Sequence, residues 1–157
     1  MKKGFLILLI FFWAIPSSFA QLKTYSFEEV EMRIKENPKP VVVFIHTSWC
    51  KYCQMMKNST FKNEDVIAIL NKDFYFVSFD AESKESIHFN NHTFRFKPSG
   101  QDVGIHELAV ELATIEGKVV YPTITVLNSD YSILLQSSSY KDAKTLMSLL
   151  KDVLLKP

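Results

Sequence analysis

The chain has 157 residues, a formal net charge of +1 and nearly equal numbers of basic (18) and acidic (17) residues. This length is typical of one compact domain. The lysines are dispersed among glutamates and aspartates, without the basic stripe and interleaved aromatic residues that mark a nucleic-acid-binding surface. We therefore predict a single domain that does not bind nucleic acid.

The first twenty residues are typical of a secretory signal peptide. Met1-Lys2-Lys3 precedes an apolar run from Phe5 to Ile15, and small residues follow up to Ala20. The run is shorter than the ~20 apolar residues that a membrane-spanning helix needs, so we expect cleavage after Ala20 and no stable membrane anchor. Loss of the two lysines would change the net charge from +1 to −1. Export would place the chain in a periplasmic or other extracytoplasmic space, where disulfides persist.

An amphipathic helix and a buried strand are predicted next. Ser26-Phe27-Glu28-Glu29 matches the capping box S-x-x-E, and apolar residues then recur at helical spacing to about Glu36. Asn37-Pro38-Lys39-Pro40 ends this helix because neither proline can continue it. The apolar run from Val41 to Ile45 is typical of a central parallel strand that is buried on both faces.

The two cysteines of the chain follow this strand, in the sequence Trp49-Cys50-Lys51-Tyr52-Cys53. The residues from Cys50 to Lys57 are predicted to form the first turns of a helix, which places Cys50 at a helix N-terminus. There, unpaired backbone N–H groups and the helix dipole stabilise the thiolate, the form of cysteine that attacks disulfides. Cys53 lies one turn further on and is partly covered by the helix. The spacing predicts an attacking Cys50 and a resolving Cys53 in thiol–disulfide exchange.

A structural disulfide and a metal site are the other roles that such a pair can have. A bridge across so short a loop removes little chain entropy from the unfolded state, and no second cysteine pair completes a four-sulfur zinc site. His88 and His92 lack a supporting cysteine or carboxylate cluster, so we assign no metal site. A C-x-x-C motif beside a β–α pattern favours redox chemistry, with the disulfide itself and no other cofactor. The alternative is a binding module or copper metallochaperone that holds Cu(I) with the same pair.

Helices and strands alternate in the rest of the chain. Asn63-Glu64-Asp65 begins a helix, and the residues from Phe74 to Phe79 cluster aromatic residues and valine as a strand does. Residues 83–100 form a polar and aromatic insertion around an Asn90-Asn91 turn. We expect this insertion to be a hairpin or a long decorated loop that affects the choice of partner and that the fold can lose.

The last third of the chain is predicted to contain one more helix, two strands and a C-terminal helix. We expect them at Gly104 to Ile115, Val119 to Leu127, Tyr131 to Gln136 and Lys141 to Leu155. The two strands are predicted to be antiparallel, with a turn at residues 128–130. The whole pattern predicts one α/β domain with a central mixed sheet and helices on both faces.

The order of these motifs resembles the thioredoxin superfamily. A strand, Trp-Cys-x-x-Cys and a helix are followed much later by Tyr121-Pro122-Thr123 before an apolar strand. The resemblance extends from about Ser26 to Leu155, and it is greatest to secreted thioredoxin-like proteins and to the C-terminal domain of the disulfide-bond protein D type. It implies a thioredoxin-like fold for the mature chain, residues 21–157. It also implies exchange with protein thiols and disulfides and a redox partner that the sequence does not identify.

The resemblance implies roles for five residues near the cysteines. In that family a cis-proline packs against the cysteine pair, and the residue before it presents its backbone to an extended substrate. Pro122 and Tyr121 stand at these positions. Trp49 is expected to shield the attacking sulfur and to offer a docking surface. Lys51 and Tyr52 are the variable pair that tunes redox poise in the superfamily, and a cation at Lys51 should favour a nearby thiolate.

One position departs from the family pattern. Many relatives carry a buried acidic residue six positions before the first cysteine, as proton acceptor for the second cysteine, and this chain has Phe44 there. An apolar ring cannot accept a proton, so we expect Cys53 to keep a high pKa and to resolve slowly unless His46 or Lys57 assists it. A hydrogen-bonded loop residue is the alternative role for His46.

Overall fold

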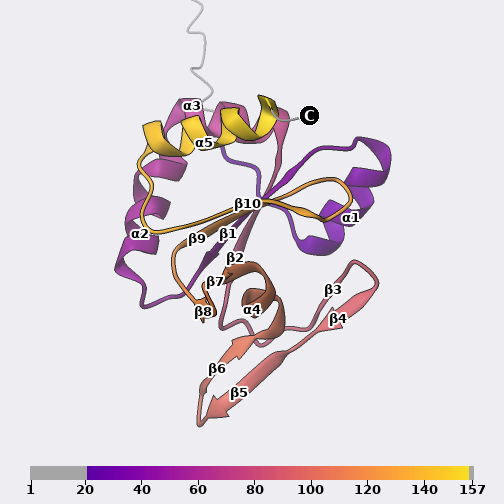
Figure 1. Cartoon of the computed structure of the whole chain (residues 1–157), viewed down its shortest axis with the longest axis vertical. Helices are drawn as coiled ribbons and strands as arrows, with labels where there is room; N and C mark the ends of the chain where they lie inside the picture. Colours follow the sequence, from indigo (N-terminus) through magenta and orange to yellow (C-terminus); the bar gives the residue numbers. More distant parts are fainter. Residues whose placement is uncertain (1–20, 156–157) are drawn as a thin grey trace, which may run out of the picture.

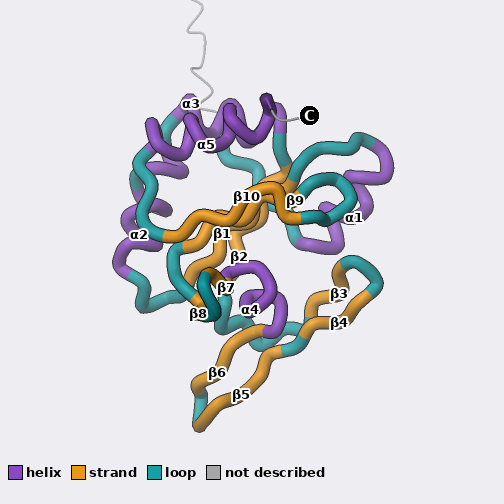
Figure 2. Tube along the Cα trace, in the orientation of Figure 1, coloured by secondary structure: helices purple, strands orange, loops and turns teal. Residues whose placement is uncertain are grey.

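The computed structural model describes residues 21–155, and the predicted signal peptide lies outside them. A four-stranded sheet forms the centre of the molecule, in the order β10, β9, β1, β2 (Figures 1 and 2). Strands β1 (Val41–His46) and β2 (Tyr75–Asp80) are parallel. Strand β9 (Thr123–Leu127) is antiparallel to β1 and to the edge strand β10 (Ile133–Ser138). The sheet is therefore mixed, as predicted.

Helices cover both faces of this sheet. Helices α1 (Phe27–Glu36) and α4 (Glu107–Ala113) share one core with Val41, Val43 and Ile45 of β1. The opposite core contains Val42 and Phe44 together with helices α2 (Lys51–Asn58), α3 (Glu64–Asp73) and α5 (Ala143–Leu155). Alternate residues of a strand point to opposite faces, and all six residues of β1 are buried. The continuous apolar run of β1 thus follows from packing on both sides, and the predicted α/β fold is confirmed.

Local signals in the sequence set where these helices begin. The Ser26 side chain accepts the N–H of Glu29, and the Glu29 carboxylate accepts the N–H of Ser26 at 2.8 Å, which completes the predicted capping box. Asn63 caps α3 by accepting two backbone N–H groups, after the short helix η1 (Thr60–Lys62).

None of the described helices is long and apolar enough to cross a membrane.

The segment after β2 forms two hairpins, of which β3–β4 lies beside α1 and β5–β6 extends past α4, away from the central sheet (Figure 1). The first consists of β3 (Ile87–Phe89) and β4 (His92–Phe94), and the second of β5 (Phe96–Gly100) and β6 (Val103–His106). Asn90 and Asn91 have φ values of 50° and 58°. Positive φ at both turn residues gives a two-residue turn whose twist matches the flanking strands. The second hairpin extends the predicted insertion from residue 100 to residue 106.

The first hairpin belongs to the hydrophobic core. Phe89 is only 4% exposed, and its ring centroid lies 5.0 Å from that of Phe27 in α1. The N–H of Asn90 also donates to the Glu31 carboxylate of α1 at 2.7 Å. The expectation that the fold can lose residues 83–100 therefore does not hold for this hairpin, since its loss would expose one side of the core.

The helix predicted from Gly104 to Ile115 is shorter at both ends. Residues 104–106 belong to β6, and residues 114–119 form a small hairpin of β7 (Thr114–Ile115) and β8 (Lys118–Val119). Gly104 lies so close to the Lys97 backbone of β5 that a side chain there would collide with it. Strand pairing thus overrides the helical spacing of the apolar residues at this point.

His106 joins the second hairpin to the core. Its side chain is fully buried, Nε2 donates to the Glu85 carbonyl at 3.0 Å, and Nδ1 accepts the N–H of Leu108 at 3.2 Å. The imidazole therefore caps α4 while it holds the connection between β2 and β3. Burial lowers the pKa of His106, so the neutral ring is the form that this arrangement stabilises.

We predict that Phe89→Ala lowers the free energy of unfolding by about 3–5 kcal/mol, the usual cost of truncating a buried phenylalanine. Val103 at the tip of the second hairpin is 54% exposed, so Val103→Ser should change it by less than about 0.5 kcal/mol. Urea unfolding of both variants measures the difference. Two equally small effects would mean that the first hairpin lies outside the cooperative core.

Candidate functional site

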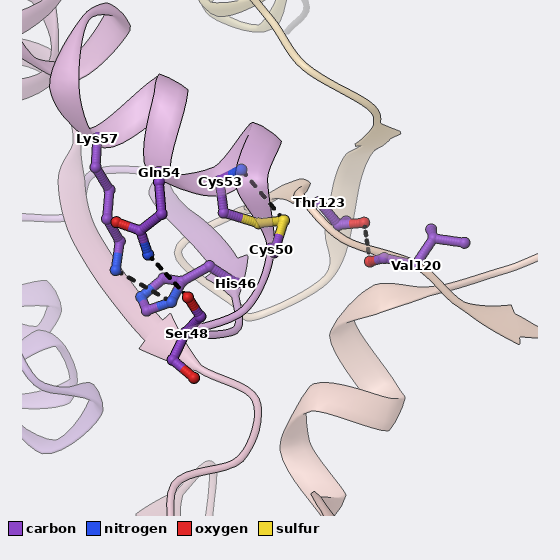
Figure 3. Close-up of a disulfide and its surroundings, with 8 residues drawn as sticks. All are labelled: His46, Ser48, Cys50, Cys53, Gln54, Lys57, Val120 and Thr123. Atoms are coloured by element: carbon purple, nitrogen blue, oxygen red, sulfur yellow. Dashed lines mark hydrogen bonds between the residues drawn. A yellow bond between two sulfur atoms is a disulfide. The ribbon is translucent and has the colours of Figure 1, made fainter.

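Cys50 and Cys53 form a disulfide at the start of α2 (Figure 3). Cys50 is the N-cap residue, and its Sγ accepts the N–H of Cys53 at 3.2 Å. Cys50 is 6% exposed, whereas Cys53 is 0% exposed. Cys50 therefore keeps a small exposed area and Cys53 keeps none, so that a partner thiol would meet Cys50 first. The same helix supplies an N–H group and the positive end of its dipole to stabilise a thiolate at Cys50.

The loop before β9 brings Pro122 to the cysteine pair. Thr123 pairs with Ile45 of β1, and β1 leads directly into the cysteine loop, so the two loops meet at one edge of the sheet. The Tyr121–Pro122 peptide bond is cis, and Pro122 is buried. The Thr123 hydroxyl donates to the Val120 carbonyl at 2.8 Å, which fixes the turn of this loop (Figure 3).

Trp49 and Tyr121 lie side by side next to the disulfide. Their ring centroids are 6.0 Å apart in an edge arrangement. Trp49 is 65% exposed, and its Nε1 donates to the Glu82 carboxylate at 3.0 Å. Burial, together with the negative charges of Glu82 and Asp80, raises the pKa of Tyr121 to about 12. Tyr121 is therefore a neutral phenol at physiological pH, and the two rings offer an uncharged surface.

A second apolar surface lies on the exposed side of α2. Tyr52 and Met55 are exposed there, and the Tyr52 ring lies 6.5 Å from that of Tyr140. A groove of about 620 Å³ runs between α2 and the loop that precedes α5. It is lined by Ser48, Trp49, Lys51, Gln54, Met55, Asn58, Ser59 and Tyr140. Lys51 and Tyr52 are thus exposed on α2, and Trp49 belongs both to this groove and to the contact with Tyr121.

His46 lies beneath α2 at the end of β1, where it is buried. Its Nδ1 is 3.2 Å from the Nζ of Lys57, and its Nε2 is 3.1 Å from the hydroxyl of Ser78. Burial, together with the positive charge of Lys57, lowers the pKa of His46 to about 4 against the opposing effect of Asp80. His46 is therefore neutral at physiological pH.

The position of the family's acidic residue is filled by an apolar ring. Phe44 is fully buried, and its ring centroid lies 4.7 Å from that of Phe61 and 5.2 Å from that of His46. No group of three or more His, Cys, Asp or Glu side chains within residues 21–155 could hold a metal ion.

Several residues around the site were missing from the sequence prediction. Ser78 and Asp80 lie in the second half of β2 and Glu82 follows it, and Asp80 pairs with His46 across the parallel strands. A signal for them was present, because the carboxyl ends of neighbouring parallel strands meet at the same edge of a sheet. Tyr140 had no such signal, since only the three-dimensional packing brings it to α2.

A thioredoxin-like domain model matches residues 27–154, which is most of the chain. The chain belongs to the thioredoxin-like family. Human spermatogenesis-associated protein 20 is 36% identical over 53 residues, which are 34% of this thioredoxin-like chain. The curated relatives are much longer proteins, and the chain spans only 7% to 8% of their length.

Solved structures show the same fold as this thioredoxin-like chain. An oxidoreductase named DsbH has a TM-score of 0.63 at 19% identity, with 90% of each chain covered. The oxidised C-terminal domain of DsbD from Neisseria meningitidis has a TM-score of 0.53 at 17% identity, covering 83% of this chain and 98% of that domain. The resemblance to thioredoxins and to the disulfide-bond protein D type is thus confirmed. With the paired cysteines, it supports a thiol–disulfide oxidoreductase-like role.

We predict that the free energy of unfolding falls as the pH is lowered from about 6.5 toward 4. An unfolded histidine takes up a proton near pH 6.5, whereas folded His46 resists protonation down to about 4. The stabilisation that comes from the neutral His46 is fully present above pH 6.5. Up to about 3 kcal/mol of it is lost as the pH falls to about 4. Urea unfolding at several pH values, compared with a His46→Phe variant, measures this term. Parallel curves for the two proteins would contradict it.

Proposed function

We propose that this thioredoxin-like chain is an extracytoplasmic thiol–disulfide oxidoreductase that exchanges disulfides with protein substrates. The observation that carries the proposal is the inequality of the two sulfurs. Cys50 caps a helix and keeps 6% of its surface exposed, whereas Cys53 lies one turn further along the helix with no exposed surface. A pair that only stabilised the fold would need neither an accessible sulfur nor a docking surface around it.

The first step forms a mixed disulfide with the substrate. In the reduced protein, the Cys50 thiolate attacks one sulfur of a substrate disulfide. A bond forms between the Cys50 sulfur and that sulfur, the substrate S–S bond breaks, and the second substrate sulfur leaves as a thiolate that takes up a proton. The N–H of Cys53, which donates to the Cys50 sulfur, stabilises the attacking thiolate.

The second step releases the substrate. The Cys53 thiol gives up its proton and attacks the Cys50 sulfur, so that the Cys50–Cys53 bond forms and the mixed disulfide breaks. The remaining substrate sulfur leaves as a thiolate and is protonated. Two electrons and two protons have then passed to the substrate. The same steps run in reverse when the partner is a dithiol, so the redox partner decides the direction.

The surface around the disulfide suits an extended peptide with apolar side chains near its cysteine. Trp49 packs against Tyr121 next to Cys50, and Trp49 also lines the groove beside Met55. The backbone of Tyr121, which precedes the buried Pro122 in the same loop, is the group that would pair with such a peptide. Main-chain pairing gives affinity without a sequence requirement, and the pockets select the side chains.

The proposed location rests on the amino-terminal sequence. Residues 1–20 have the charged, apolar and small-residue parts of a secretory signal peptide. Outside the reducing cytosol, both the disulfide of this chain and the disulfides of its substrates would persist. We therefore place the exchange reaction in the periplasm or another extracytoplasmic space, without a stable membrane anchor after cleavage.

We predict that Cys53→Ala accumulates covalent complexes with protein thiols in cells and that Cys50→Ala does not. Without the resolving thiol, the mixed disulfide at Cys50 cannot be released by the protein itself. Non-reducing electrophoresis after acid quenching of free thiols detects the complexes, which should disappear on reduction. Equal trapping by the two variants would contradict the roles assigned to the two sulfurs.

We also predict that Trp49→Ser lowers kcat/KM for a protein substrate by about tenfold, because a single exposed aromatic contact often carries more than about 1 kcal/mol of binding energy. The rate with dithiothreitol, which needs no docking surface, should change little. Met32→Ser on α1 is the control, since Met32 is equally exposed but lies away from the site. A similar loss with both substrates would assign Trp49 a structural role.

A further inference from the structure

Lys57 lies on the same side of α2 as Cys53. The two residues are four positions apart, which places them one helical turn apart on one face, with about 5–6 Å between their Cβ atoms. The Nζ of Lys57 is 3.2 Å from the Nδ1 of His46 (Figure 3). An ammonium group can only donate, so Nδ1 accepts, and Nε2 carries the proton that it donates to Ser78. Lys57 is thus held by a neutral imidazole, one helical turn along α2 from the second cysteine.

The ammonium group of Lys57 also has access to solvent. Lys57 and Ser78 line a groove of about 550 Å³ whose floor includes Phe44 and Phe61, and Lys62 lies at the same groove. The two hydrogen-bond partners of the buried His46 therefore both lie on a water-accessible surface. A proton that leaves or reaches Lys57 can be exchanged with water on this side of α2.

Among the described residues, no carboxylate forms an ion pair with the ammonium group of Lys57. Asp80 on β2 is the acidic group that faces both Lys57 and His46, and it raises the pKa of each against the larger effect of burial. Lys62 is a second cation at the groove. The ion pairs among residues 21–155 join Lys84 to Asp102 and Lys97 to Glu107, so neither involves Lys57.

Cys53 needs such a group because its sulfur is fully buried. Burial in an apolar environment raises the pKa of a thiol, since it destabilises the charged form. Phe44 adds an apolar ring at the place where relatives have a carboxylate, and it supplies no proton acceptor. A positive charge on the same helix face lowers the pKa of a thiol, which is the opposite of what a carboxylate does.

We propose that Lys57, positioned by His46, stabilises the thiolate of Cys53 and exchanges its proton. This inference rests on the proposed exchange function. When a partner thiolate attacks the Cys50 sulfur, the Cys50–Cys53 bond breaks and its electron pair leaves with the Cys53 sulfur. The ammonium of Lys57 neutralises this thiolate and gives it a proton, which water replaces through the groove. In the reverse step, the neutral amine of Lys57 takes the proton of the Cys53 thiol.

The pKa of Cys53 tests this assignment directly. In a Cys50→Ser background Cys53 is the single thiol of the chain, and serine keeps a residue suited to capping α2. The thiolate absorbance in the ultraviolet and the rate of alkylation by iodoacetamide, both followed against pH, give the pKa. Adding Lys57→Gln should raise the pKa of Cys53 by about one unit, at the low end of the effect of a nearby opposite charge, so that the thiolate becomes about tenfold rarer at pH values well below the pKa.

Three matched variants separate charge from structure. Lys57→Arg keeps the positive charge and should leave the pKa close to that of the protein with Lys57. Lys62→Gln removes a cation from the same groove without touching His46, and it should have little effect. His46→Phe frees the ammonium group and should raise the pKa by less than Lys57→Gln does. If Lys57→Gln does not fold, added salt should still raise the pKa of Cys53 in the protein with Lys57, because it screens a partly exposed cation.

The inference would be overturned by a pKa of Cys53 that stays the same when Lys57→Gln is introduced. An equal shift of this pKa with Lys62→Gln would also overturn it. Reduction of insulin disulfides by the dithiol form and oxidation of a dithiol peptide by the disulfide form are measured alongside, both with the unmodified chain. The absence of both reactions would contradict the proposed function, whereas a pKa insensitive to Lys57 would contradict only the assignment of this residue.

Discussion

The amino terminus of α2 sets the chemistry of this chain, because one turn of helix separates a slightly exposed cysteine from a fully buried one. Cys50 takes the N-cap position and Cys53 takes the first inward position of the helix. The rest of the fold holds this turn in place. Strand β1 is buried on both faces and delivers the cysteine loop, and its pairing with β9 brings Pro122 to the same edge of the sheet.

The charge beneath the helix differs in sign from the family pattern. Phe44 fills the position of an acidic residue, and the ionisable groups beneath α2 include the neutral His46 and Lys57, with Asp80 of β2 facing both. A carboxylate would oppose the formation of a second thiolate, whereas a cation favours it. The two arrangements can perform the same exchange, but they give the buried cysteine different pH dependences.

Much of this site could be predicted from the sequence, since its main signals are local. The apolar run of β1, the spacing of the cysteines and the capping box of α1 each depend on residues close together in the chain. The hairpin of β5 and β6 could not be predicted in the same way, because the close approach of Gly104 to Lys97 decides it. The bond between His46 and Lys57 also depends on packing, as it joins the end of a strand to the face of a helix.

The equilibrium reduction potential of the Cys50–Cys53 couple tests the central claim most directly. The protein is equilibrated with reduced and oxidised glutathione over a range of ratios, and the fraction of disulfide is measured after acid quenching. A catalyst of exchange should give a reversible two-electron couple between about −270 and −120 mV, the range of known oxidoreductases of this kind. A potential below about −300 mV, typical of structural disulfides, would contradict the account.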